Sequence, residues 1–201
     1  MIMIERCFIN KNQKIIIVFG LPGAGKTTLI NSFIKTNDGF TRLSGGTLIN
    51  EALSEQDRDY LRKQNKEEIL SNQEKLVFNF HRNKKRLAGQ NIIFDGHCLI
   101  KDKEQQVEVP AEIIRRLEPD LIIFVDEDLE TIVKHRTMDP NRPNRESETI
   151  KDLKVIRKLQ LKICEEYSTK IGVPFKNLQS PTIKNFGTLI QSSLSLPISE
   201  K

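Results

Sequence analysis

The most constraining feature of this 201-residue chain is a short apolar run that leads directly into a glycine-rich turn and an amphipathic segment. The run, 15–19, is too short and too uniformly apolar for a surface helix. Its β-branched residues favour a strand that is buried on both faces of a parallel sheet. The turn, 20–27, reads GLPGAGKT, and the residues after it, TLINSFI, have the apolar spacing of a helix. The chain is therefore expected to fold around a strand, a glycine loop and a helix.

The glycine loop has the spacing G-x-x-x-x-G-K-[ST] of a phosphate-binding loop. Three glycines let successive backbone N–H groups face inward, where a side chain would block a phosphate. The helix that opens at Gly25 directs the positive end of its dipole to the same point. Lys26 would reach the β- and γ-phosphates of a nucleotide, and the Thr27 hydroxyl would ligate Mg²⁺. The alternative is a chance match in a glycine-containing turn, which the preceding strand makes rarer.

Length and composition point to one soluble domain with insertions. The chain is 37% hydrophobic and 29% charged, and no apolar run approaches the length of a membrane span. The first residues, MIMIERCFINKNQK, are only briefly apolar and have no small-residue cleavage pattern. We therefore expect no signal peptide, no membrane partner and a cytoplasmic location.

Cysteine usage and charge exclude some other classes of protein. Cys7, Cys98 and Cys164 are odd in number and far apart, which favours reduced thiols over a zinc site or a disulfide framework. The net charge of +5 is mild for this length and does not require a nucleic-acid partner. The basic run HRNKKR at 81–86 is interpreted as the solvated face of a helix.

Further strands and helices alternate along the chain. Strands are expected at 40–43, 91–95, 121–125 and 173–178. Helices are expected at 47–53, 66–87, 110–117, 126–136, 148–171 and 182–192. The helix at 148–171 is expected to turn Ile150, Leu153, Ile156, Leu159 and Ile163 to the core. This alternation predicts an α/β fold of three layers, a five-stranded parallel sheet with right-handed crossovers and helices on both faces.

Candidate site residues follow the ends of the second and third strands. Ser44, Gly45 and Gly46 are small enough for a ligand to approach closely, although a tight strand-to-helix turn would need the same residues. Asp95 ends the run NIIFD, where a carboxylate beside a phosphate-binding loop would make a second Mg²⁺ contact. It would otherwise cap the next turn. Gly96 and His97 follow at the same rim.

Arginines occupy two other segments. Arg58 and Arg62 have the spacing of four that places both guanidinium groups on one face of a helix. The segment 136–145 has two prolines and three arginines, so it cannot continue a helix. Guanidinium groups in such a loop suit a mobile lid that closes over phosphates, and the alternative is a solvated basic loop.

Taken in order, these motifs resemble a known family. The series GLPGAGKT, LSGGTLINEA, DRDYLRK, IIFDGH and VPAEIIRRLEPDLIIFV, followed by an arginine-bearing loop, resembles the P-loop nucleoside monophosphate kinases over 14–178. The resemblance is greatest to the archaeal-type adenylate kinases. The chain departs from the pattern in a slightly longer lid that contains Pro143, and in a DGH motif without the proline and arginine of bacterial adenylate kinases.

The resemblance implies transfer of the γ-phosphoryl group of ATP, with Mg²⁺, to a nucleoside monophosphate, AMP or dAMP being favoured. The donor would be held by Gly20, Gly23, Ala24, Gly25, Lys26, Thr27 and Thr28. The acceptor would be held by Ser44, Gly45, Arg58, Arg62 and His97. Catalysis would depend on Lys26, Arg58, Arg136, Arg142 and Arg145, and the metal on Thr27 and, through water, Asp95. The single domain would comprise a core at about 14–178, NMP-binding helices at about 44–88 and a lid at about 136–147.

Two other functions stay open at the level of sequence. A hydroxyl-acceptor kinase would need a base, and Asp95 could serve, although the pair Arg58 and Arg62 favours an anionic acceptor. A nucleotide-gated switch would bind ATP with little turnover and dock a partner through residues 1–13 or 81–86. The sequence also leaves the oligomeric state open.

Overall fold

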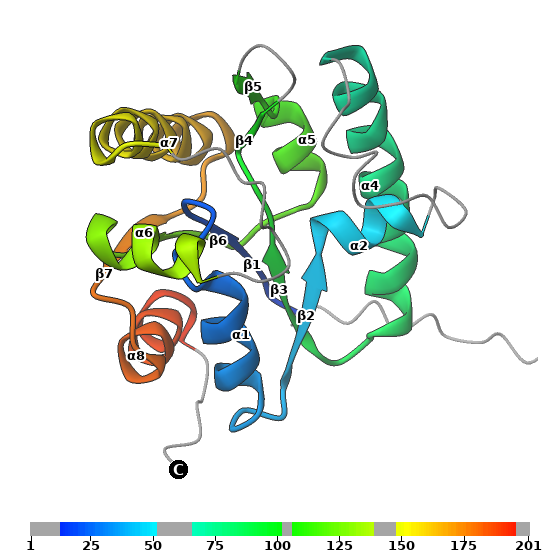
Figure 1. Cartoon of the computed structure of the whole chain (residues 1–201). Coiled ribbons are helices and arrows are strands. Elements are labelled where there is room, and N and C mark those ends of the chain that lie inside the picture. Colours follow the sequence, from blue (N-terminus) through cyan, green and yellow to red (C-terminus); the bar gives the residue numbers. More distant parts are fainter. Residues whose placement is uncertain (1–12, 52–65, 102–105, 139–147, 196–201) are drawn as a thin grey trace, which may run out of the picture.

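The computed structural model describes residues 13–51, 66–101, 106–138 and 148–195. Its centre is a five-stranded, wholly parallel sheet of order β2-β3-β1-β6-β7 (Figure 1). The strands are β1 (Ile15–Phe19), β2 (Phe40–Ser44), β3 (Asn91–Asp95), β6 (Leu121–Asp126) and β7 (Phe175–Gln179). The predicted fold class is therefore confirmed, with each strand within two residues of its expected start and end.

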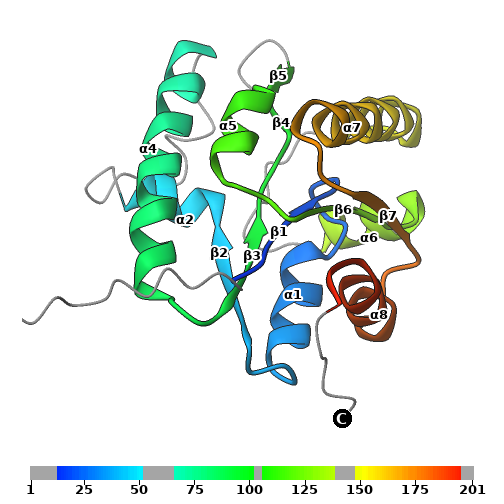
Figure 2. The ribbon, with the colours of Figure 1, turned by 180° about the vertical axis from the view of Figure 1, so that it is seen from behind.

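Helices cover both faces of the sheet, as Figures 1 and 2 show from opposite sides. One face carries α2 (Gly45–Asn50), α4 (Lys66–Arg86), α5 (Ala111–Arg116) and α7 (Ile150–Ile171). The other carries α1 (Lys26–Ile34), α6 (Leu129–Thr137) and α8 (Ile183–Leu194). Because side chains of a strand alternate between faces, Ile15 and Ile17 of β1 pack into the first layer and Ile16 and Val18 into the second.

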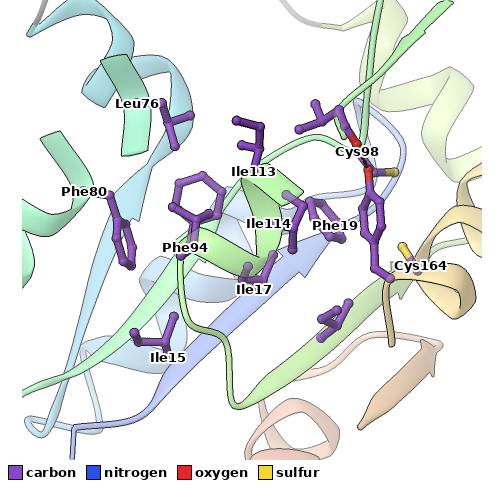
Figure 3. Packing of buried hydrophobic residues seen from close by; sticks show 14 of the residues in the cluster. Ile15, Ile17, Phe19, Leu76, Phe80, Phe94, Cys98, Ile113, Ile114 and Cys164 are labelled. Atoms are coloured by element: carbon purple, nitrogen blue, oxygen red, sulfur yellow. Dashed lines mark hydrogen bonds between the residues drawn. The ribbon is translucent and has the colours of Figure 1, made fainter. Parts of the chain in front are cut away.

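Aromatic rings fix the helices on the sheet. Phe80 of α4 meets Phe94 of β3 edge to face at 5.8 Å between ring centroids (Figure 3). Phe33 of α1 meets Phe186 of α8 in the same way at 5.2 Å, which joins two helices that lie side by side in Figure 2. One pair therefore joins a helix to the sheet, and the other joins two helices of the opposite layer.

A second, two-stranded sheet was not predicted. Strands β4 (Leu99–Lys101) and β5 (Gln106–Glu108) pair antiparallel beyond the end of β3. Each has three residues, too few to show the period-two alternation by which strands are recognised in a sequence. The hairpin lies between β3 and α5, so it follows directly on the strand-end residues Asp95 and His97.

Three predicted helices need correction. The one expected at 47–53 runs from Gly45 to Asn50, with Glu51 as its C-cap. The one expected at 126–136 begins at Leu129, because Asp126 closes β6 and Asp128 is the N-cap, accepting a hydrogen bond from the Thr131 N–H. On α7, Leu153 and Ile163 are buried as expected, but Ile150 and Leu159 are 41% and 40% exposed. Ile156 is partly buried against the core as expected, and Cys164 and Tyr167 extend the buried stripe of α7, so the prediction is wrong only for Ile150 and Leu159.

Two further findings concern the surface. Arg82 and Lys84 of the run 81–86 form exposed ion pairs with Glu51 and Glu118, which fits the interpretation of this run as a solvated helix face. Among the helices within the described ranges, none combines the length and apolar character needed to cross a membrane.

Candidate active site

The glycine loop closes tightly over the carboxyl end of β1. Gly20, Gly23 and Gly25 all have positive φ, at 148°, 96° and 74°. A Cβ on Gly20 would lie 2.6 Å from the Val125 carbonyl oxygen, so the loop packs against β6 with no space for a side chain. Gly25 is the N-cap of α1, and the first turn of that helix opens on the loop. This is the backbone geometry of an anion-binding nest at a helix N-terminus.

Lys26 lies against this loop. Its side chain is buried, and Nζ donates to the carbonyl oxygens of Gly20 at 2.7 Å and Leu21 at 3.3 Å. The ammonium group therefore sits at the wall of the loop, where a phosphate in the nest would come within reach of it.

The end of β3 meets the start of α1 through one carboxylate oxygen. Asp95 is 8% exposed, and its Oδ2 accepts a hydrogen bond from the Thr27 hydroxyl at 2.7 Å. The same oxygen accepts from Arg42 of β2, by Nε at 3.0 Å and Nη2 at 2.8 Å. The sequence predicted that Thr27 and Asp95 share a site. It did not predict Arg42.

Thr27 and Asp95 fit Mg²⁺. A hydroxyl and a carboxylate are hard oxygen donors, and Mg²⁺ in nucleotide sites binds one or two such protein groups together with phosphates and water. In the parts of the chain that the structure describes, no group of three or more His, Cys, Asp or Glu residues could hold a metal. Thr27 and Asp95 would fill at most two of the coordination positions of Mg²⁺.

These elements border one cleft of about 1150 Å³. This volume is slightly above the upper end of the roughly 300–1,000 Å³ that is typical of ligand pockets. The predicted residues that line it are Gly23, Ala24, Gly25, Lys26, Thr27, Thr28, Ser44, Gly45, Asp95 and His97. Gly20 does not line the cleft, and its carbonyl oxygen accepts a hydrogen bond from Lys26 Nζ. The structure thus gathers the predicted donor and acceptor residues that it describes around one space.

The cleft has further walls that sequence reasoning missed. Polar groups come from Arg42 of β2, Asn50 of α2 and Gln73 of α4. The Asn50 Oδ1 atom is buried, and no hydrogen-bond partner for it lies within the described residues. Apolar side chains line the region around α4, α5 and the small sheet: Leu76, Phe94, Ile100, Val109, Ile113, Ile114 and Leu117. Their only sequence signal was an ordinary core pattern, which does not distinguish a packed side chain from a cleft wall.

Arg136 holds the outside of the loop and is absent from the cleft lining. Its Nε donates to the Pro22 carbonyl at 2.7 Å, and its Nη1 pairs with Glu148. The neighbouring His135 Nδ1 lies 3.0 Å from the Gly23 carbonyl oxygen. The end of α6 therefore contacts the glycine loop at two backbone carbonyl groups, those of Pro22 and Gly23. The other four predicted arginines, Arg58, Arg62, Arg142 and Arg145, lie outside the described residues.

Comparison with known proteins now identifies the family. A family model described as an AAA domain matches residues 19–154, well over half of the chain. The chain belongs to this family. The match begins at the last residue of β1 and includes the glycine loop, Asp95 and Arg136.

Individual relatives of this AAA-domain protein are kinases. It is 26% identical over 187 residues to the adenylate kinase of Methanothermobacter thermautotrophicus, which covers 91% of this chain and 96% of the relative. The resemblance to archaeal-type adenylate kinases is thereby confirmed. These relatives support a phosphotransferase of the nucleotide kinase type.

Solved structures confirm the fold. Shikimate kinase from Acinetobacter baumannii, in complex with shikimate, has a TM-score of 0.58 at 16% identity and covers 91% of this chain and 94% of its own. Thymidylate kinase from Candida albicans has a TM-score of 0.52 at 13% identity and covers 92% of each chain. At these identities the likeness concerns the fold alone.

Proposed function

We propose that the protein transfers the γ-phosphoryl group of ATP to a nucleoside monophosphate, with AMP or dAMP as favoured acceptor, giving two nucleoside diphosphates. The observation that carries this proposal is that one cleft joins the glycine loop with Lys26 to the strand ends with Ser44, Gly45 and His97. The adenylate kinase relatives match this chain over most of its length, which supports the same acceptor class.

On the donor side, the glycine nest and Lys26 would bind the β- and γ-phosphates of ATP. The positive φ of Gly20, Gly23 and Gly25 and the N-terminus of α1 favour an anion there. Donor contacts are assigned to Gly20, Gly23, Ala24, Gly25, Lys26, Thr27 and Thr28. Thr27, and Asp95 through water, would hold Mg²⁺, which when bound neutralises charge on the transferring phosphoryl group.

On the acceptor side, the proposal uses the rim that follows β2 and β3. Ser44 and Gly45 are small and line the cleft, and the exposed His97 stands at its edge. Arg58 and Arg62 are proposed to neutralise the acceptor phosphate, within NMP-binding helices at about 44–88. Arg136, Arg142 and Arg145 are assigned to a lid at about 136–147, on a single domain with its core at about 14–178.

The mechanism needs alignment and charge neutralisation rather than a strong base. A monophosphate acceptor is already a nucleophile, so the protein has only to hold it in line with the γ-phosphoryl group. Lys26 and the arginines offset the negative charge of the two substrates. A hydroxyl acceptor is less well served, because Asp95 Oδ2 is already engaged by Thr27 and Arg42.

The test is a product assay. Purified protein is supplied with Mg-ATP and, in turn, with AMP, GMP, CMP, UMP and their deoxy forms, and the products are separated by anion-exchange chromatography. Diphosphate should form from AMP and dAMP. Diphosphate from another monophosphate alone would correct the acceptor, and transfer to none of them, with ATP still bound, would contradict the proposed reaction.

Two variants of the same helix identify the site. Lys26→Ala should lower the rate by orders of magnitude, because the loop loses its one long cationic side chain. Lys35→Ala removes an exposed lysine at the other end of α1 and should leave the rate within about twofold. Equal activity in both variants would exclude this loop as the site of transfer.

A further inference from the structure

Arg42 places a positive charge against the carboxylate on which the proposed metal site depends. It lies on β2, an edge strand, in register with Ile93, and its guanidinium reaches up to Asp95 at the strand end. Its Nε and Nη2 both donate to Asp95 Oδ2, at 3.0 Å and 2.8 Å. A guanidinium group stays protonated at all ordinary pH values, so this charge is permanent.

The pairing changes what the cleft offers to a cation. Asp95 Oδ2 carries three donors, one from Thr27 and two from Arg42. The negative charge of the carboxylate is offset by Arg42, and Lys26 adds another positive charge to the same cleft. A bare divalent cation that approached Thr27 would therefore meet the Asp95 carboxylate with Arg42 already paired to it. Its attraction to this region would be weak.

The same contacts orient the Thr27 hydroxyl. Its hydrogen is directed at Asp95 Oδ2, which leaves the lone pairs of the oxygen for a cation. Arg42 holds Asp95 in the rotamer that accepts this hydrogen, so it acts on the site through Asp95. The phosphates of a bound nucleotide would add negative charge beside Thr27.

We propose that Arg42 is a positioning residue that prevents the free site from holding a bare divalent cation, so that the cation enters only as its complex with a nucleotide. The inference rests on the proposed function, because it takes Thr27 and Asp95 as the metal-binding groups. It concerns binding in the absence of an acceptor and needs no turnover.

The test uses Mn²⁺ as a spectroscopic probe for Mg²⁺. The electron paramagnetic resonance signal of free Mn²⁺ is measured as nucleotide-free protein is added, for the wild type and Arg42→Gln. We expect at least tenfold tighter Mn²⁺ binding by the variant, since the carboxylate loses its compensating charge. The gain should disappear in Arg42→Gln/Asp95→Asn. Equal affinity of wild type and Arg42→Gln would overturn the proposal.

Arg157 provides a matched control. It pairs with Asp126, another buried carboxylate at a strand end, at 2.6 Å, and neither residue lines the cleft. Arg157→Gln should leave Mn²⁺ affinity within about twofold of wild type. A gain equal to that of Arg42→Gln would mean that any uncovered carboxylate binds the ion, and would overturn the assignment to this site.

Two additional variants keep the test decisive. If Arg42→Gln fails to fold, Arg42→Met retains the aliphatic stem and should show the same gain. Arg42→Lys keeps the charge and should bind Mn²⁺ as weakly as wild type, whereas a gain in Arg42→Lys would contradict the role of charge. The binding assay contains no acceptor, so its result does not depend on the result of the kinase assay. If the protein is an active kinase and Mn²⁺ binding is unchanged in Arg42→Gln, only the proposed role of Arg42 is rejected.

Discussion

The Thr27 hydroxyl donates a hydrogen bond to Asp95 Oδ2 across 2.7 Å, although 68 residues separate the two in the sequence. The contact exists because β1 and β3 are parallel neighbours, so that the loop after one strand lies beside the end of the other. It joins the proposed donor loop to the proposed acceptor rim. Loss of this contact should therefore affect both.

Substitution of Thr27 tests this link. Thr27→Ala removes both the proposed metal ligand and the hydrogen bond to Asp95, and should lower kcat/KM for ATP about 10- to 100-fold. Thr27→Ser keeps the hydroxyl and should stay within about threefold. Steady-state assays with varied Mg-ATP measure the effect, and equal activity in Thr27→Ala and wild type would exclude the hydroxyl from the site.

Arg136 supports the loop from outside. Because Arg136→Met removes the hydrogen bond to the Pro22 carbonyl, ATP binding should weaken about tenfold, which corresponds to loss of one charge-assisted bond of about 1.5 kcal/mol. Isothermal titration with a non-hydrolysable ATP analogue gives the dissociation constant. Lys134→Met, an exposed site on the same helix, is the control. A dissociation constant unchanged in Arg136→Met would show that the loop keeps its shape unaided.

Gly20 has no room for a side chain. Gly20→Ala would press a Cβ against the Val125 carbonyl at a φ that other residues rarely adopt, and should lower the free energy of unfolding by about 2 kcal/mol or more. Gly39→Ala has no atom within 4 Å of the new Cβ and should change stability by less than about 0.5 kcal/mol. Urea denaturation compares them, and equal midpoints would mean that the loop relaxes around the methyl group.

Tyr167 is expected to make the free energy of unfolding depend on pH in the alkaline range. Its hydroxyl donates to the Val109 carbonyl inside the core, and burial raises the pKa of Tyr167 above its ordinary value. Since the folded state holds this proton more tightly, the stabilisation is present below the unfolded pKa of about 10 and is lost as pH rises beyond it. Tyr167→Phe should lower the free energy of unfolding by about 1–2 kcal/mol at pH 7. Above pH 10 the variant should lose less stability than the wild type loses. Thermal unfolding from pH 7 to 11 would show parallel curves if the prediction is wrong.

The sequence predicted the sheet well because parallel strands are buried on both faces. Runs such as 15–19 and 121–125 are short and uniformly apolar, which favours buried strands, and the glycine loop is defined by its spacing. Asp95 could be proposed as a site residue because it ends such a run in a chain that carries a phosphate-binding loop.

Arg42 could not be predicted in the same way. In the run FTRLS it looks like an ordinary polar residue of a half-exposed strand, and its role depends on β2 pairing with β3 in one particular register. The partners of Arg136 could not be predicted either. The sequence placed it in a lid, and its described contacts are with the backbone of Pro22, 114 residues away, and with Glu148. Such partners follow from tertiary packing, which no local pattern contains.

The position of β1 at the middle of the sheet has a consequence for biosynthesis. Ile15 pairs with Ile92 and Ile16 with Leu121, so β1 is synthesised well before both of the strands with which it pairs. A nascent chain that ends before β6 already contains the whole glycine loop but lacks Val125, against which Gly20 packs. Closure of these long loops has to precede the contacts that stabilise them, which slows folding. The packing of Gly20 against Val125 can therefore form only after β6 has been synthesised.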